Sequence, residues 1–356
     1  MRNIFPKSTV CDNSKFDLYY LNFDKGSPRS NHDEKISIII TNRKSKSSSN
    51  KLVIQSLRNQ TVPPDEIIFV EDDESPYSEK LIKPFVDKYV FLKNDWIFNK
   101  SWCINVGVNE AKNDLIISHD NDLVCENDFI ERVLCEYKDH NKPRMMLCWN
   151  IIVDIHKEAV TFFKNKQYNY TYPVRYQEER EARYPLQPTA PAGSILFDKD
   201  FYYEVGGHDE KLVGWGAEDA SFFMSCDVMG VVHFNNSIDG IKLYHLYHPC
   251  RGDGNEVYEY YTGPYLEFLR TMNASTILRF TTDRKATRKI GDKLCPLGDV
   301  DEYNALKNVV KGVVKAGAFR INNITGEIVV PTDNQMIQFK KDIDSGDVVK
   351  THEWKK

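Results

Sequence analysis

The chain has 356 residues, of which 41% are hydrophobic and 28% are charged. This length allows one large α/β domain with an extension, or two domains. The formal net charge of -5 argues against general polyanion binding, although a local basic patch can still attract a polyanion. The first residues carry charges throughout, unlike a signal peptide, and the longest apolar run, residues 36–41, is too short to span a bilayer.

The eight cysteines are scattered along the chain, and none forms a Cys-x-x-Cys pair. A structural zinc site is therefore not expected. Isolated thiols are typical of a reducing compartment, so we expect a cytoplasmic location, which would be the host cytoplasm for a viral protein.

The first half of the chain alternates between apolar strands and helices. Residues 36–40 are a run of isoleucine interrupted only by Ser37, as in a buried parallel strand. Further strands are expected at 66–70, 89–92 and 114–119, and helices at 51–59, 78–86 and 100–111. This order predicts an α/β fold with a mostly parallel sheet and helices on both faces.

The second half of the chain is less regular. Residues 156–190 show no clear periodicity and are expected to be irregular. The expected strands are 16–23, 145–155, 193–197, 231–234 and 241–246, and the expected helices are 128–137, 199–205, 214–229, 256–272 and 301–315, followed by a hairpin at 320–330. We therefore expect a lead-in at 1–34, a main domain at 35–255 and a mixed α/β or helical C-terminal region at 256–356.

Two acidic clusters follow predicted strands, at residues 71–74 and 120–122. Ligands of parallel sheets bind outside the carboxyl ends of the strands, where these clusters would lie. Two carboxylates in Asp120-Asn121-Asp122 can reach one divalent cation, and Mg²⁺ or Mn²⁺ suits such oxygen ligands. Asp-x-Asp alone is a frequent motif, and it can equally form an Asx-turn that caps the next helix.

The residues around this motif carry a family resemblance. The segment 98–107 followed by the strand that ends in Asp120-Asn121-Asp122 resembles the donor half of GT-A glycosyltransferases, most closely the family 2 enzymes and the β-1,4-galactosyltransferase and chondroitin-polymerase branches. Residues 38–43 resemble their nucleotide loop, and 70–75 resemble their Val-Asp-Asp-Gly-Ser element, with Glu74 in place of the glycine. The resemblance implies that the donor is bound by Thr41, Arg43, Asp72, Asp73, Lys100, Asn105, Asp120 and Asn121.

The same branch is matched in order by residues 192–197, 205–210 and 214–219. The resemblance implies that Asp219 is the general base and that Glu218 binds the acceptor, with Gly214, Trp215 and Gly216 beside it. Trp215 can stack on a sugar ring, or it can be an ordinary core aromatic. The two acids at a helix start are also compatible with simple helix capping.

Residues 244–249 lie where these enzymes carry a metal-binding histidine, so the resemblance implies that Asp122 binds the metal together with His245 or His248. His245 is slightly preferred. A neutral imidazole would complete a mixed nitrogen and oxygen site for Mn²⁺ or Mg²⁺. A single histidine in a strand is more often structural, and only the context favours a ligand here.

The expected function is an inverting, metal-dependent transfer of a sugar from a nucleoside diphosphate sugar, by default a UDP-sugar, to a hydroxyl of a glycan or polysaccharide. A different acceptor would be a hydroxymethylated base of viral DNA, held by the basic residues Arg279, Arg284, Lys285, Arg288, Lys289 and Lys293. The same stretch could lie on an anionic membrane or be a solvated helix face.

Two other classes of protein use similar acidic motifs. One is a non-catalytic nucleotide-sugar-binding module on the same scaffold, and the other is a nucleotidyltransferase. Intact acids at 122, 218 and 219 argue against the first. The acceptor-like element at 214–219 argues against the second, which would have no need of it.

Overall fold

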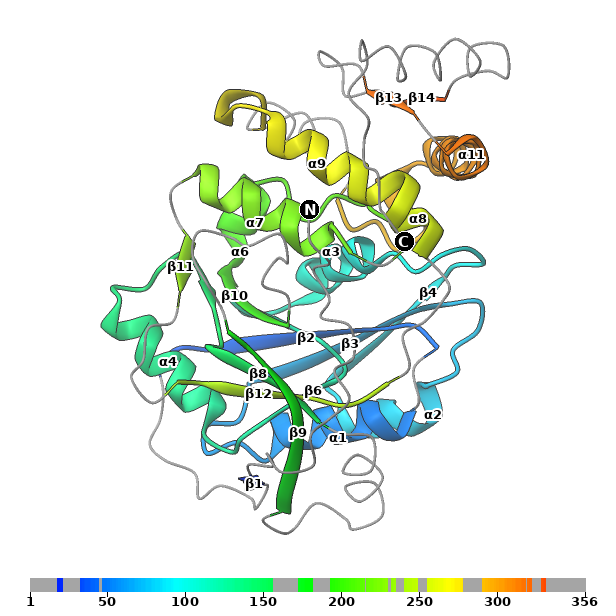
Figure 1. Cartoon of the computed structure of the whole chain (residues 1–356). Helices are drawn as coiled ribbons and strands as arrows, with labels where there is room; N and C mark the ends of the chain where they lie inside the picture. The colour runs from blue at the N-terminus through cyan, green and yellow to red at the C-terminus, as the bar shows by residue number, and fades with distance from the viewer. Residues whose placement is uncertain are drawn as a thin grey trace.

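In a computed structural model, most of the chain forms two large sheets with flanking helices, together with a small two-stranded sheet near the C-terminus (Figure 1). None of the helices among the described residues is long and apolar enough to cross a membrane. The six described cysteines are all free thiols. The described residues are 18–21, 33–44, 47–155, 172–181, 193–214, 216–229, 232–234, 240–248, 255–277, 290–317, 319–321 and 328–330.

The larger sheet has the strand order β11-β7-β10-β5-β2-β3-β4. The pairings make six of these seven strands run in one direction, with β10 reversed between β5 and β7. The predicted mostly parallel α/β sheet is therefore confirmed. Its strands are β2 (Ile36–Asn42), β3 (Glu66–Asp73), β4 (Lys88–Lys93), β5 (Leu115–His119), β7 (Met145–Leu147), β10 (Ser194–Asp198) and β11 (Val232–Phe234).

The smaller sheet has the order β1-β9-β8-β12-β6. Its central strand β8 pairs in parallel with β12, and the pairing puts Asp154 directly beside His245. Its strands are β1 (Leu18–Leu21), β6 (Leu123–Cys125), β8 (Ile151–Ile155), β9 (Tyr172–Glu181) and β12 (Lys242–His245). The second sheet therefore carries a residue of the predicted metal site next to a carboxylate that the sequence did not single out.

Helices cover both faces of the larger sheet, with α1 and α2 on one side and α3, α6 and α7 on the other (Figure 1). The strands β2 and β3 between them are buried along their whole length. Apolar burial of this extent is the main source of stability for such a layer. The helices are α1 (Ser47–Arg58), α2 (Glu79–Ile82), α3 (Lys100–Glu110), α4 (Phe129–Asp139), α6 (Lys199–Glu204) and α7 (Glu218–Val228).

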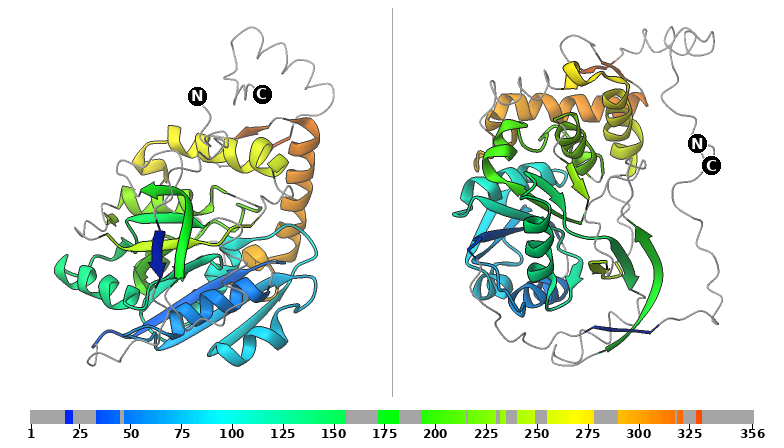
Figure 2. Two further views of the ribbon diagram at one scale, coloured as in Figure 1. Left: turned by 60° about the horizontal axis from the view of Figure 1, so that its bottom comes forward. Right: turned by 90° about the vertical axis from the view of Figure 1, so that its left-hand side faces the viewer.

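In Figure 1 the C-terminal helices α9 and α11 lie on the same side of the larger sheet as α7, and Figure 2 gives two further views of them. Two small apolar clusters join them to residues 212–220, one through Val213 and α11 and the other through Ala217 and α9. The domain limits expected at 34 and 255 stay a prediction. The elements are α8 (Asn255–Val257), the π-helix η2 (Tyr258–Thr262), α9 (Gly263–Thr271), the short 3₁₀ helix η3 (Pro296–Gly298), α11 (Val300–Ala316), β13 (Arg320–Ile321) and β14 (Ile328–Val329).

Several predicted elements differ from the structure. The helix expected at 214–229 begins only at Glu218, because residues 214, 216 and 217 have positive φ values. The helix expected at 78–86 ends at Ile82 and continues as the 3₁₀ turn η1 (Lys83–Phe85), because Pro84 has no amide hydrogen to donate. The strand expected at 145–155 is two strands, since Asn150 turns away to bond Ile241 and carries the chain from one sheet to the other. The irregular stretch expected at 156–190 contains the ten-residue strand β9, which backbone pairing with β8 holds despite its many charged residues.

A glycine fixes how closely α3 approaches the larger sheet. A Cβ added at Gly107 would meet Cγ2 of the fully buried Ile39 on β2 at 2.5 Å. We expect Gly107→Ala to lower the free energy of unfolding by about 1–3 kcal/mol, because overpacking a rigid core outweighs the gain in helix propensity. Unfolding of both proteins in urea measures this difference in the free energy of unfolding.

The matched control for this prediction is Gly312→Ala on α11. There an added Cβ would meet only the end of the Val330 side chain, at 3.1 Å. Without a rigid neighbour, the helix propensity of alanine is expected to leave stability unchanged or to raise it by up to about 1 kcal/mol. Equal losses in both variants would contradict the packing argument.

Candidate active site

The loop Asp120-Asn121-Asp122 leaves β5 at the carboxyl edge of the larger sheet and is fixed at both ends. The Asp120 amide donates to the carbonyl of Gly193, at 2.8 Å, and the Leu246 amide donates to the carbonyl of Asp122, at 2.7 Å. The first bond ties the loop to the start of β10, and the second ties it to the end of β12. The backbone therefore brings the acids of one motif to the histidines of another, more than a hundred residues away.

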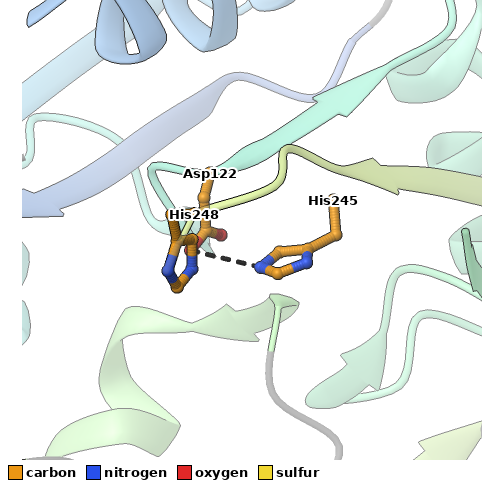
Figure 3. Close-up of side chains that lie close together, drawn as sticks. All are labelled: Asp122, His245 and His248. Atoms are coloured by element: carbon orange, nitrogen blue, oxygen red, sulfur yellow. Dashed lines mark hydrogen bonds and ion pairs between the residues drawn. The ribbon is translucent and has the colours of Figure 1, made fainter. Parts of the chain in front are cut away.

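Asp122, His245 and His248 form a cluster whose ligand atoms all lie within 4.8 Å of one another (Figure 3). The Asp122 Oδ2 atom lies 3.5 Å from Nε2 of His245 and 3.2 Å from Nε2 of His248. Ligand atoms about 2.1 Å from one ion lie about 3.0 Å apart when they meet at a right angle, so this spacing suits a single cation. Both histidines that the sequence left as rivals lie within reach of it.

The donor set of this cluster is one carboxylate and two imidazoles. Mg²⁺ prefers oxygen ligands, whereas Mn²⁺ accepts a mixed nitrogen and oxygen set. The residues therefore fit a divalent cation. Asp122 and the two histidines would hold it at the edge of the sheet, where the His248 side chain is exposed.

Lys100, the first residue of α3, lies among three carboxylates. Its Nζ atom is 2.9 Å from Asp120 Oδ1, 2.8 Å from Asp219 Oδ2 and 3.5 Å from Glu218 Oε1. Burial alone would lower the pKa of Lys100, but the three acids outweigh it and raise this pKa well above its usual value. Lys100 therefore stays positively charged and joins the predicted donor motif to the predicted acceptor motif.

The two acids at the start of α7 differ in their ionisation. Burial raises the pKa of Glu218 to about 7, with the negative charge of Asp219 acting in the same direction. Burial also acts to raise the pKa of Asp219, but Lys100 and His208 outweigh it and hold that pKa below its usual value. Asp219 is therefore a carboxylate at neutral pH, as a proton acceptor must be, while Glu218 changes its charge near pH 7.

His208 is a neighbour of Asp219 to which the sequence assigned no role, although it lies within the matched segment 205–210. Its Nε2 atom is 3.8 Å from Asp219 Oδ1, and its Nδ1 atom is 2.9 Å from the hydroxyl of Tyr202. The ring is buried and stacks on Phe222 of α7 at 4.3 Å between centroids. Its contact with the acid depends on this packing, which the motif does not reveal.

Asn105 does not face this centre. Its side-chain amide donates to the His208 carbonyl at 3.0 Å and to Glu210 Oε1 at 2.7 Å, and its oxygen accepts from Tyr202 and from the His208 amide. These bonds occupy both ends of a side chain that is only 1% exposed. Asn105 therefore fixes the 206–210 turn against α3, and its expected part in donor binding stays a prediction.

The residues expected to bind the nucleotide are all buried. Asp72 is fully buried, with Oδ1 on Arg43 at 3.1 Å and Oδ2 accepting from the Asn99 amide at 2.7 Å. Asp73 is also buried, and it accepts from the amides of Lys44 and Glu74. These two acids hold the loops at the ends of β2 and β3, and their expected contact with the donor stays a prediction. By holding these loops, Asp72 and Asp73 also determine where the loop backbone lies relative to a bound nucleotide.

Arg43 and Thr41 are largely covered as well. The guanidinium of Arg43 donates to the carbonyls of Asp72 and Trp96, and Thr41 is 5% exposed at the end of β2. Both residues therefore lie at the expected edge of the sheet, but the Arg43 guanidinium is engaged with protein groups. The sequence predicted correctly that Arg43 and Thr41 lie at this edge of the sheet. It did not predict which protein groups their side chains contact.

Asn121 is held by a chain of amides. Its Nδ2 donates to Asn42 Oδ1 at 2.7 Å, and Asn42 in turn donates to the buried Glu71 at 3.3 Å. Asn50 of α1 also donates to Asn42, at 3.2 Å. The middle residue of the Asp-x-Asp motif is therefore anchored to β2, which keeps the two flanking acids at the edge of the sheet.

The predicted acceptor element precedes α7. Gly214 and Gly216 adopt φ values of +87° and +86°, which side chains rarely tolerate. A Cβ added at Gly216 would also meet the Tyr258 ring at 2.9 Å, so η2 packs directly on this glycine. Trp215 lies outside the described residues, as do Arg279, Arg284, Lys285, Arg288 and Lys289, whereas Lys293 pairs with Glu110.

Buried acids make the stability of the metal-free protein depend on pH. Burial raises the pKa of Asp72 from 3.8 to about 7 and that of Glu218 from 4.5 to about 7. Between about pH 4 and pH 7 the folded chain holds protons that the unfolded chain releases, so a rise in pH favours unfolding. We expect the thermal midpoint in EDTA to fall from pH 5 to pH 7.5.

The variant that isolates one of these acids is Glu218→Gln, which should reduce the slope of the midpoint against pH. The exposed Glu256 provides the comparison, and Glu256→Gln should leave the slope unchanged. A midpoint that rises over this interval in all three proteins would contradict the assigned burial of these carboxyls.

Residues 37–206 match the sequence model described as glycosyl transferase family 2. None of the curated proteins compared with the chain matches it. Similar solved structures include GalNAc-T7 with UDP, GalNAc and Mn²⁺ (13% identity over 78% of this chain and 55% of that chain, TM-score 0.47).

Two further structures are similar at the same low level of identity. A Drosophila β-1,4-galactosyltransferase 7 mutant with manganese, UDP-Gal and xylobiose is 17% identical over 60% of this chain and 71% of that chain, with a TM-score of 0.38. TarS of S. aureus is 14% identical over 70% of this chain and 43% of that chain, with a TM-score of 0.40. The chain spans about half the length of GalNAc-T7, so the assignment depends on the sequence model and the strand order. Residues 37–206 are therefore similar to family 2 glycosyltransferases, and the mostly parallel sheet with helices on both faces is consistent with their GT-A fold.

Proposed function

We propose that the chain is a metal-dependent, inverting glycosyltransferase that moves a sugar from a UDP-sugar to a hydroxyl group of a glycan or polysaccharide. The observation that carries the proposal is the position of Lys100, which contacts Asp120 of the Asp-x-Asp loop and Asp219 of α7 at the same time. The loop that carries the candidate metal ligand Asp122 is therefore joined through one lysine to a buried ionised carboxylate. This is the arrangement that a transfer between two bound substrates needs.

The proposed roles follow the geometry. A cation on Asp122 and the two histidines would neutralise the charge that grows on the departing diphosphate. Asp219 takes the proton from the acceptor hydroxyl as the acceptor oxygen forms its bond to the anomeric carbon and the bond from that carbon to the diphosphate oxygen breaks. Attack from the side opposite the leaving group inverts the anomeric configuration. Lys100 keeps Asp219 ionised and oriented until the acceptor arrives.

We choose UDP as the nucleotide because of the resemblance to the β-1,4-galactosyltransferase branch. We also propose that the catalytic domain spans residues 35–255 and that residues 256–356 form an accessory region. A DNA acceptor is not proposed, because in the described part of the basic stretch Lys293 is already paired with Glu110. A non-catalytic binding module would need no buried carboxylate kept ionised beside the donor loop. The ionised Asp219 therefore favours an enzyme.

A donor panel tests the proposal. Thermal unfolding is followed with Mn²⁺ and each of several nucleotide sugars, and the matching donor is expected to raise the midpoint, since a ligand at about 100 times its Kd adds about 2.7 kcal/mol to the stability of the native state. Slow release of the nucleotide from that donor, without acceptor, would show that the site is catalytic. A panel in which no nucleotide sugar shifts the midpoint would reject the proposal, and a shift without any turnover would favour the binding module.

A further inference from the structure

His245 is held by a carboxylate on its far side. Asp154 Oδ1 lies 2.7 Å from Nδ1 of His245, while the Nε2 atom of the same ring lies 3.5 Å from Asp122. The two residues are directly paired in the register of the parallel strands β8 and β12. The contact is therefore built into the sheet and does not depend on a loop.

We propose that Asp154 is a positioning residue for the metal site, which orients His245 and selects the form of its ring that can bind the ion. The inference rests on the proposed function, because it assumes that the cluster holds a cation. Asp154 itself does not contact the ion in this arrangement, since the whole imidazole ring lies between them. It acts through His245.

The physical argument concerns the two ring nitrogens. In neutral imidazole one nitrogen carries the hydrogen and the other has the lone pair. A carboxylate at 2.7 Å from Nδ1 accepts the hydrogen there, which leaves the lone pair on Nε2, the nitrogen that faces Asp122. The negative charge behind the ring also makes Nε2 a better donor to a cation, and partners of this kind are typically worth about 10–100-fold in metal affinity.

The same contact separates the roles of the two histidines. The ring of His245 is about one quarter exposed and is held between Asp154 and Asp122, whereas the ring of His248 is about half exposed. A ring that is already oriented loses less freedom when it binds an ion. His245 is therefore the anchored ligand and His248 the adjustable one.

The test measures binding of Mn²⁺ alone by the loss of the free Mn²⁺ signal in electron paramagnetic resonance, without any substrate. We expect Asp154→Ala to weaken Mn²⁺ binding by about 10–100-fold, and Asp154→Asn to weaken it less, because the amide oxygen can still accept from Nδ1 but carries no charge. Thermal unfolding in EDTA checks that each variant is folded. If Asp154→Ala does not fold, Asp154→Asn decides alone.

A double-mutant cycle with His245→Ala shows whether Asp154 acts through the ring. Once the ring is gone, Asp154→Ala should have no further effect on Mn²⁺ affinity. Glu126→Gln is the matched control, because Glu126 contacts the neighbouring residue Tyr244 of β12, at 3.1 Å, and not a histidine. This variant should bind Mn²⁺ like the unaltered protein.

The outcomes distinguish the inference from the function on which it rests. Mn²⁺ binding that is unchanged in Asp154→Ala, or that falls equally with and without His245, overturns the role of Asp154 and leaves the proposed function standing. An unaltered protein that does not bind Mn²⁺ at all overturns the metal site itself.

Discussion

Replacing Asp219 with asparagine is expected to lower kcat by about 10²–10⁴-fold, the range that a positioned general base usually contributes. The side chains have the same shape, and Lys100 keeps its contact with Asp120, so the donor side of the site should be preserved. Donor affinity, measured by titration with Mn²⁺ present, is therefore expected to stay close to that of the unaltered enzyme. Only the proton acceptor is lost.

The control for Asp219→Asn lies on the same helix. Asp227 is exposed near the end of α7, and Asp227→Asn should leave kcat unchanged. Turnover that persists at the original rate in Asp219→Asn would remove the base assignment. Loss of donor affinity together with kcat would show instead that Asp219 contributes to donor binding through Lys100.

Removal of the metal is the second change with a large expected effect. Treatment with EDTA should abolish transfer, and Mn²⁺ should restore it more effectively than Mg²⁺, because two of the three clustered ligands are imidazoles. Asp122→Asn should weaken Mn²⁺ binding by about 10²-fold or more, since even partners beyond the ligands are worth about 10–100-fold. Asp122 contacts both histidines, so its loss affects the whole cluster.

Substitution of one histidine should be less severe than substitution of Asp122. His248→Ala removes the more exposed of the two rings and leaves His245 and Asp122 in contact. We expect its activity to be recovered at high Mn²⁺ concentration, whereas that of Asp122→Asn is not. Full activity in EDTA would contradict a role for the cluster in catalysis.

Local patterns in the sequence were enough to predict the order of strands and helices in the first half of the chain. The isoleucine run at 36–40, the acids at the end of β3 and the acids after β5 indicated the edge of the sheet where the candidate site lies. The strand β9 could not be predicted in this way, because its composition is charged and its partner β8 supplies the reason for its shape. The preferences of individual residues for strand or helix do not predict pairing between segments that are distant in the sequence.

The contacts of individual side chains could not be predicted from the sequence either. Asp72 and Asp73 look like ligand-binding acids in the sequence, yet both are buried and bonded to the protein. Asp154 belongs to no motif, and His208 lies in a matched segment without an expected role, so strand register and helix packing alone reveal their contacts with the site. The motifs therefore predicted where the candidate site lies. The residues that orient its side chains could be identified only from the three-dimensional structure.

The lysine shared by three acids has a consequence for the order in which substrates act. Anything that binds beside Asp120 changes the field that Lys100 exerts on Asp219, and anything that binds at Asp219 changes the field at Asp120. Such an interaction is reciprocal, so the donor must alter acceptor affinity by the same factor by which the acceptor alters donor affinity. Any such change would link the two substrates thermodynamically through one ammonium group, and comparison of donor affinity with and without acceptor would measure the size of that link.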